Sequence, residues 1–140
     1  MGLGFESGHR SKEIILFEPL KFWMDIYRKA FSKDIVRDAA NEEQALAWLF
    51  KHFNHGTILV LGGNTNYRAD LLSILSFALQ QTEKKFMPII FANTDDLTLN
   101  KELRDNGCPY SSPDKNSLIK SIEEHGVSKV GRSLRGIGMR

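Results

Sequence analysis

Polar and glycine residues stand directly after four apolar runs of this 140-residue sequence, and these positions offer the clearest chemistry. Carboxylates there could coordinate a hard cation such as Mg²⁺, glycines could cradle a phosphate through backbone N–H groups, and serines could serve as nucleophiles. The positions are Glu18-Pro19, Gly62-Gly63-Asn64, Asn93-Thr94-Asp95-Asp96 and Ser111-Ser112-Pro113.

Each chemistry lacks a necessary part. The glycine loop at Gly62-Gly63 has neither the Gly-Lys-Ser/Thr of a P-loop nor the GxGxxG spacing of a dinucleotide fold, and it fits a tight strand-to-helix turn. Ser111 and Ser112 have no evident His or carboxylate partner. Asp95 and Asp96 are typical of a turn with helix-capping aspartates. We therefore expect no catalytic residue and no cofactor.

The histidines and the single cysteine do not predict a metal site either. His52 and His55 lie three residues apart at the end of a predicted helix, but no third ligand is apparent, and this position favours interaction with the helix dipole. Cys108 cannot form an internal disulfide, and no metal-binding spacing surrounds it. A small buried side chain beside a strand is the interpretation that fits Cys108.

Alternating strands and helices must position these residues. Apolar runs at 13–17, 34–36, 57–61, 87–91 and 108–111 predict five strands, and helical periodicity predicts a helix after each. Leu20, Trp23 and Tyr27 begin the apolar face of the first helix. The apolar faces of the later helices are predicted at Ala45, Leu46, Leu49, Phe50 and Phe53 in the second, Leu71, Leu72, Leu75, Ala78 and Leu79 in the third, Leu97, Leu99 and Leu103 in the fourth, and Leu118, Ile119 and Ile122 in the fifth.

The run at 57–61 is continuously apolar, as in a strand buried on both faces. The expected fold class is therefore α/β: a doubly wound, five-stranded parallel sheet of order 2-1-3-4-5, as in flavodoxin and CheY. In such a sheet, ligands bind beyond the carboxyl ends of the strands.

Across roughly residues 12–125, the ordered set of strand ends resembles the receiver domain of bacterial response regulators, and Pro113 corresponds to the proline of that family's Lys-Pro pair. The resemblance implies an acidic pair that holds Mg²⁺, an acceptor aspartate, a Thr or Ser, and a Lys. Here those positions fall on Glu18, Gly62, Asn93 and Ser112. Without a carboxylate at Gly62, no aspartyl phosphate can form, and we expect a receiver that is not phosphorylated there.

Within this group, the chain is similar to the atypical N-terminal receiver of FleQ/FlrA-type flagellar regulators, which are NtrC-class activators of σ54-dependent transcription. The shared features are Leu61-Gly62 at the acceptor position, Pro88-Ile89-Ile90 in the fourth strand, and Leu118 and Ile122 in the last helix. The resemblance implies a phosphorylation-independent regulatory and dimerisation domain that acts with the protein partners of a transcription complex.

The tail carries a second resemblance. Residues 132–136, Arg-Ser-Leu-Arg-Gly, are similar to the Arg-Ser-Leu-Val-Gly stretch that opens the AAA+ ATPase domain of that family, with a mismatch at Arg135. The resemblance implies Arg132 and Ser133 as contacts for cyclic di-GMP, together with an ATPase domain that this chain lacks. We therefore divide the chain into a flexible tail (1–11), a degenerate receiver domain (12–126), and a basic linker that opens an AAA+ domain (127–140).

Composition restricts the remaining function classes. The net charge is +2, but four positive charges lie in residues 127–140, which leaves residues 1–126 at −2. Direct nucleic-acid binding by the domain is therefore not expected. The sequence has no apolar run of membrane-spanning length and no signal peptide, so we expect a cytoplasmic protein.

Three hypotheses follow from the sequence. The first is the regulatory domain of a σ54-dependent flagellar activator. The second is a stand-alone pseudo-receiver that binds another signalling protein. The third is a flavodoxin-like cofactor binder, which would need ligand-holding residues at the strand ends.

Overall fold

A five-stranded parallel sheet forms the centre of the computed structural model, which describes residues 11–82, 87–111 and 114–124. The strands are β1 (Glu13–Phe17), β2 (Ile35–Ala39), β3 (Ile58–Gly63), β4 (Ile89–Thr94) and β5 (Tyr110–Ser111). Their order is β2-β1-β3-β4-β5, and every neighbouring pair is parallel. The predicted fold class and strand order are confirmed.

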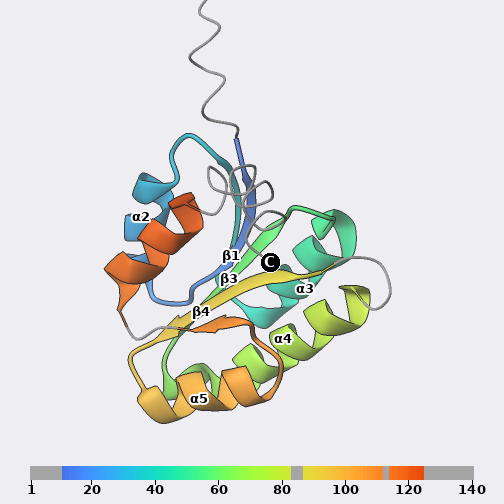
Figure 1. Ribbon diagram of the computed structural model, residues 1–140, viewed down its shortest axis with the longest axis vertical. Coiled ribbons are helices and arrows are strands. Elements are labelled where there is room, and N and C mark those ends of the chain that lie inside the picture. Colours follow the sequence, from blue (N-terminus) through green and yellow to red (C-terminus); the bar gives the residue numbers. More distant parts are fainter. Residues whose placement is uncertain (1–10, 83–86, 112–113, 125–140) are drawn as a thin grey trace, which may run out of the picture.

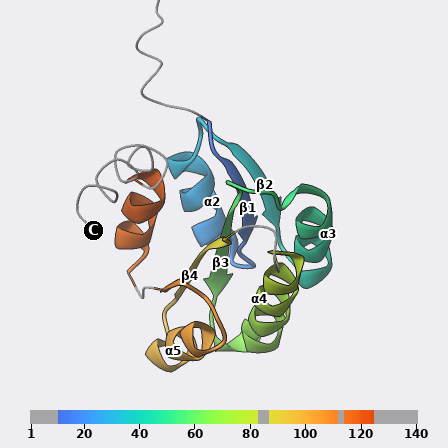
Figure 2. The same ribbon diagram turned by 45° about the vertical axis from the view of Figure 1, so that its right-hand side comes forward.

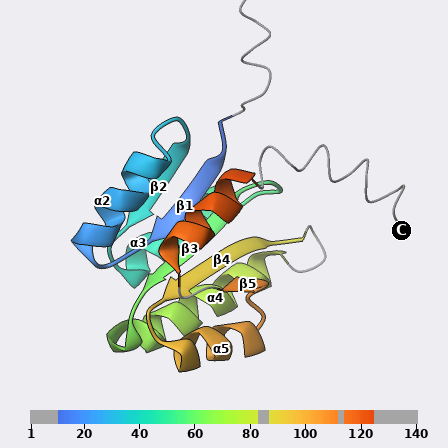
Figure 3. The same ribbon diagram turned by 60° about the vertical axis from the view of Figure 1, so that its left-hand side comes forward.

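Helices cover both faces of this sheet, as Figures 1 and 2 show. They are α2 (Lys21–Ala30), α3 (Glu42–His52), α4 (Arg68–Thr82), α5 (Leu97–Asp105) and a final helix over residues 115–124; a 3-10 turn, η1 (Thr65–Tyr67), precedes α4. The final helix lies beside α2 on one face, in front of β1 and β3 in Figure 3. Helices α3, α4 and α5 cover the other face.

Alternating side chains of the central strands build a separate core on each face. Ile14 and Leu16 of β1 pack with α2 and the final helix, whereas Ile15 and Phe17 pack with α3, α4 and α5. This alternation follows from the two-residue period of a strand. All four side chains are fully buried, so β1 has no solvent-facing side after Glu13.

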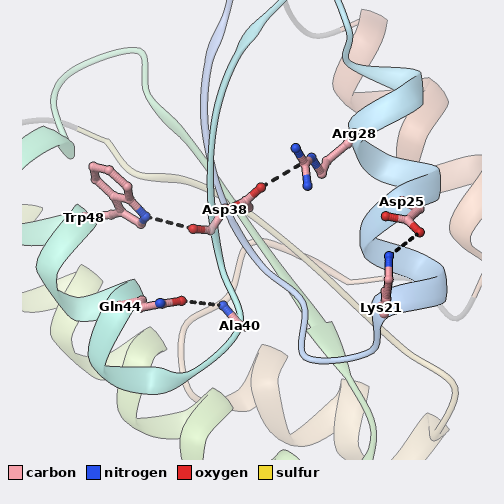
Figure 4. A network of polar contacts seen from close by, with 7 residues as sticks. All are labelled: Lys21, Asp25, Arg28, Asp38, Ala40, Gln44 and Trp48. Atoms are coloured by element: carbon pink, nitrogen blue, oxygen red, sulfur yellow. Dashed lines mark hydrogen bonds and ion pairs between the residues drawn. The ribbon is translucent and has the colours of Figure 1, made fainter.

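Polar contacts fix the edge strand β2 to the helices on both sides of it (Figure 4). The Asp38 carboxylate lies 3.4 Å from Arg28 Nε of α2, and the Asp38 carbonyl accepts a hydrogen bond of 2.9 Å from Trp48 Nε1 of α3. Near the start of α3, Gln44 Oε1 accepts from the backbone N–H of Ala40 at 2.9 Å. Asn41 caps this helix as expected, accepting from Gln44 N.

Some predicted details are wrong. The third and fourth strands extend further than their apolar runs, so Gly62, Gly63, Asn93 and Thr94 lie within strands rather than after them. Phe50 lies in the predicted apolar stripe of α3 but is 74% exposed. Leu97, in the first turn of α5, is 70% exposed. Both residues have the spacing of an apolar helical face, but their side chains lie outside the part of that face that packs against the sheet.

The predicted tail at 1–11, apart from Ser11, and the predicted linker at 127–140 lie outside the described residues. Among the helices that the structure describes, none combines the length and the apolar character that a membrane crossing requires.

Candidate functional site

The sheet register brings three predicted site residues into one row. Phe17 pairs with Leu61 across β1 and β3, so the next residue, Glu18, follows beside Gly62. Gly62 in turn pairs with Asn93 across β3 and β4. Three of the four degenerate receiver positions therefore meet at the carboxyl edge of the sheet, where ligands bind in folds of this class.

Glu18 is the buried acid of this row, with 1% of its surface exposed. Its backbone N–H donates to the Ala39 carbonyl at 3.2 Å, and its Oε2 accepts from the backbone N–H of Leu20 at 3.1 Å. Within the part of the chain that the structure describes, no hydrogen-bond partner reaches Glu18 Oε1. The Glu18 carboxyl group is therefore held at one oxygen and buried at the other.

Gly62 leaves room for this carboxyl group. A Cβ atom at position 62 would overlap Glu18 Oε1 and lie 2.9 Å from Glu18 Cδ. The space that a side chain at the acceptor position would require is thus filled by the side chain that enters from β1. Gly62 therefore provides no acceptor carboxylate, and it also leaves the space that the Glu18 carboxyl group fills.

Lys115, from the first turn of the final helix, supplies a cation at the same edge. Its Nζ donates to Oδ1 of the fully buried Asn93. The same ammonium lies 4.6 Å from the ring centroid of Trp23 and 5.9 Å from that of Tyr27, both on α2. These are distances at which an ammonium is attracted to the face of an aromatic ring.

Burial and charge set the proton affinities of this cluster. Burial raises the pKa of Glu18 to about 7, although the Leu20 hydrogen bond and the Lys115 charge lower it and Asp95 raises it. Burial lowers the pKa of Lys115, which Glu18 and Asp95 raise. Burial, together with Glu18, raises the pKa of Tyr27. The cluster thus contains a carboxyl group that changes charge near neutral pH.

A pocket of about 260 Å³ opens beside this cluster. It is lined by Leu20, Trp23, Gly63, Asn93, Asp95, Asp114, Lys115 and Asn116.

The last residue of β4 and the residues directly after it take structural roles. Asp96 caps α5 by accepting from Leu99 N at 2.8 Å, as predicted, whereas Asp95 is exposed. Thr94 is fully buried, and its hydroxyl lies 3.1 Å from Asn100 Oδ1 and accepts from Asp96 N at 3.2 Å. These contacts engage the Thr94 hydroxyl with the start of α5.

Lys115 was not predicted as a site residue. Counting from Pro113 placed the family's Lys position on Ser112, which lies outside the described residues, as do Arg132 and Ser133. The useful signal is a lysine in the first helical turn after the fifth strand, because that turn stands at the same edge of the sheet. Trp23 was predicted on the apolar face of the first helix; it packs against the core on that side of the sheet, but it is only partly buried and also lines the pocket.

The residues present do not fit the Mg²⁺ ion that the receiver resemblance implies. Glu18 offers one buried carboxyl group already bonded to Leu20 N, Gly62 offers no side chain, and the Lys115 ammonium is close enough to lower the pKa of Glu18. Mg²⁺ requires several oxygen ligands in octahedral geometry. Among residues 11–82, 87–111 and 114–124, no group of three or more His, Cys, Asp or Glu side chains could hold a metal ion.

The sequence matches no family model and no curated protein. The structure, by contrast, has the fold of CheY-like response-regulator receiver domains. A CheY-like receiver domain protein from Methanospirillum hungatei JF-1 aligns with a TM-score of 0.61 at 16% identity, over 82% of this chain and 93% of its own.

Two further solved structures share the fold. A response regulator from Burkholderia pseudomallei with a phosphorylated aspartic acid, calcium ion and citrate aligns with a TM-score of 0.61 at 13% identity, over 88% of this chain and 72% of its own. NtrX from Brucella abortus in complex with ADP gives 0.63 at 15% identity, over 91% of this chain. This chain spans 29% of NtrX.

Proposed function

We propose that this chain is a phosphorylation-independent regulatory domain with a receiver fold, which acts through protein partners and not by catalysis. The observation that carries the proposal is the filled acceptor position: Gly62 has no side chain, and the Glu18 carboxyl group occupies the space where one would stand. Lys115 further supports it, because its ammonium is engaged by Asn93 and Trp23.

Incubation with a small phosphodonor such as acetyl phosphate and Mg²⁺, followed by intact-mass measurement, tests this proposal. We expect no hydroxylamine-labile gain in mass, because no carboxylate stands at position 62. A response regulator with an acceptor aspartate, treated in parallel, shows that the donor is active. A hydroxylamine-labile phosphoryl group on this chain would contradict the proposal.

The finer proposal is a dimerising regulatory domain of a cytoplasmic σ54-dependent flagellar activator, with Arg132 and Ser133 contacting cyclic di-GMP together with an ATPase domain. It is supported by the resemblance at Leu61-Gly62 and at residues 132–136. The 29% share of NtrX also shows that a unit of this fold occurs within a longer protein.

A stand-alone pseudo-receiver is the alternative. An immunoblot of the native gene product separates the two, because an activator would be several times larger than the 15.9 kDa of this chain. A band near 15.9 kDa would overturn the activator proposal.

A further inference from the structure

The receiver resemblance implies a divalent cation at an edge of the sheet where this chain places a lysine. The Lys115 ammonium comes from the final helix, whereas its contacts come from other parts of the fold: Asn93 from β4, Trp23 and Tyr27 from α2. Glu18, immediately after β1, interacts with the same charge. A single side chain thus connects the final helix to β4 and to the neighbouring helix α2, and its charge acts on Glu18.

We propose that Lys115 is the resident cation of this site and clamps the final helix to the edge of the sheet, and that protonation of Glu18 loosens this clamp. The inference deepens the proposed function and rests on it. A helix whose attachment to the sheet changes can alter how a regulatory domain acts on its protein partners. Its chemistry is a single proton transfer between solvent and the Glu18 carboxyl group.

The missing side chain at Gly62 allows the Glu18 carboxyl group to lie at this edge of the sheet. Because position 62 has no Cβ, the Glu18 carboxyl group is accommodated within the row of strand ends, where 99% of its surface is shielded from water. A charge in such an environment interacts strongly with a nearby opposite charge. Ionised Glu18 therefore attracts the Lys115 ammonium, and protonated Glu18 does not.

The other groups that face Glu18 do not replace this interaction. Asp95, after β4, is negative and exposed, and it favours the protonated form of Glu18. Tyr27, on α2, is buried, and its pKa lies above its ordinary value, so it stays neutral. Lys115 is thus the cation that responds to the charge of Glu18 among these facing groups, and the transition falls near neutral pH.

NMR titration of the Glu18 side-chain carboxyl carbon in the 140-residue chain tests the charge coupling. We expect a midpoint near pH 7 in the wild type, and a midpoint about one unit higher in Lys115→Met, because the Lys115 charge lowers the pKa of Glu18 and a close opposite charge typically lowers a carboxyl pKa by about one unit or more. Lys120→Met, which removes an exposed lysine from the same helix, is the matched control and should leave the midpoint unchanged.

Hydrogen exchange of the backbone amides in residues 118–124 tests the clamp itself. Glu18→Gln imitates the protonated acid, so at pH 8 we expect the exchange rate of these amides, taken relative to that of the α3 amides, to be about fivefold higher in Glu18→Gln than in the wild type. At pH 6 the two proteins should converge. In a Lys115→Met background, Glu18→Gln should have no effect at either pH.

Three results would overturn the inference: equal exchange of residues 118–124 relative to α3 in wild type and Glu18→Gln at pH 8, a Glu18 midpoint that Lys115→Met leaves in place, or a Glu18 resonance that shifts on addition of Mg²⁺. The last would make a metal ion the cation of the site. None of these measurements involves a phosphodonor, so the failure of the clamp and the failure of phosphorylation independence are distinguishable.

Discussion

At the scale of single residues, Glu18 and Gly62 form one unit, because the side chain of the first fills the space left by the second. A receiver acceptor aspartate and a glutamate in this position would compete for the same volume. Restoring phosphorylation therefore requires more than a carboxylate at position 62, since the Glu18 carboxyl group must also leave.

We expect Gly62→Ala to lower the free energy of unfolding by about 1–3 kcal/mol, because the new methyl group displaces the Glu18 carboxyl group from its bond with Leu20 N. In a Glu18→Ala background the overlap is absent, and the same change should cost less than about 1 kcal/mol. Urea unfolding of the four proteins of this double-mutant cycle measures the coupling. Equal costs in both backgrounds would show that the two residues do not share this space.

The pattern of polar residues after apolar runs predicted Glu18, Gly62 and Asn93 at the carboxyl ends of parallel strands, where ligands bind in such a sheet. It did not predict that Lys115 joins them. Sequence spacing shows which residues stand at the end of a strand. Whether the Lys115 side chain extends to those residues depends on how the final helix packs against α2.

At the scale of elements, a buried amide attaches α5 to the end of β4. Asn100, with 1% of its surface exposed, accepts from Thr94 N at 3.1 Å and donates to the Thr94 carbonyl at 3.0 Å. These bonds satisfy both backbone groups of Thr94 where the sheet ladder ends. The helix is thus oriented by a side chain that imitates a strand neighbour.

Replacing Asn100 with Ala should cost about 2–3 kcal/mol of unfolding free energy, since the buried N–H and C=O groups of Thr94 would lose their partner. The control is Thr98→Ala, an exposed position on the same helix, which should change stability by less than about 0.5 kcal/mol. Thermal or urea unfolding provides the comparison. Similar losses in both variants would indicate that the bonds to Thr94 contribute nothing specific.

Periodicity in the sequence predicted the type and the order of the elements. It did not predict where each strand ends or which residues of a helix are covered by the sheet. β3 and β4 continue through Gly62-Gly63 and Asn93-Thr94 because these residues pair with one another across the sheet, a long-range interaction that apolar composition does not encode. Conversely, Phe50 satisfies helical spacing and is nevertheless exposed, since the orientation of α3 on the sheet determines which residues are covered.

At the scale of the whole molecule, the buried acid makes global stability depend on pH. The folded pKa of Glu18 is about 7, above the ordinary value of 4.5, so the folded state holds this proton more tightly than the unfolded state. The resulting stability is fully present below about pH 4.5 and is lost as the pH rises through 7. This loss concerns unfolding of the whole domain, whereas the clamp concerns the attachment of one helix.

Between pH 5 and pH 8, the wild type should therefore lose on the order of 3 kcal/mol more unfolding free energy than Glu18→Gln, given about 1.4 kcal/mol per pKa unit. The glutamine variant has no proton to lose at this position, and its other titrating groups are the same. Urea unfolding of both proteins at the two pH values gives the difference. Parallel pH profiles would mean that Glu18 titrates at its ordinary value.

The two tryptophans of the chain stand on opposite faces of the sheet, Trp23 against the core beneath α2 and Trp48 against the core beneath α3. Only Trp23 lies under the Lys115 ammonium, whereas Trp48 donates its indole N–H to the Asp38 carbonyl. The molecule thus contains two tryptophan fluorophores, one per layer. In a Trp48→Phe protein, tryptophan emission would report on the layer that holds the clamp, and in Trp23→Phe on the layer that does not, so each half of the fold can be followed in solution without an added dye.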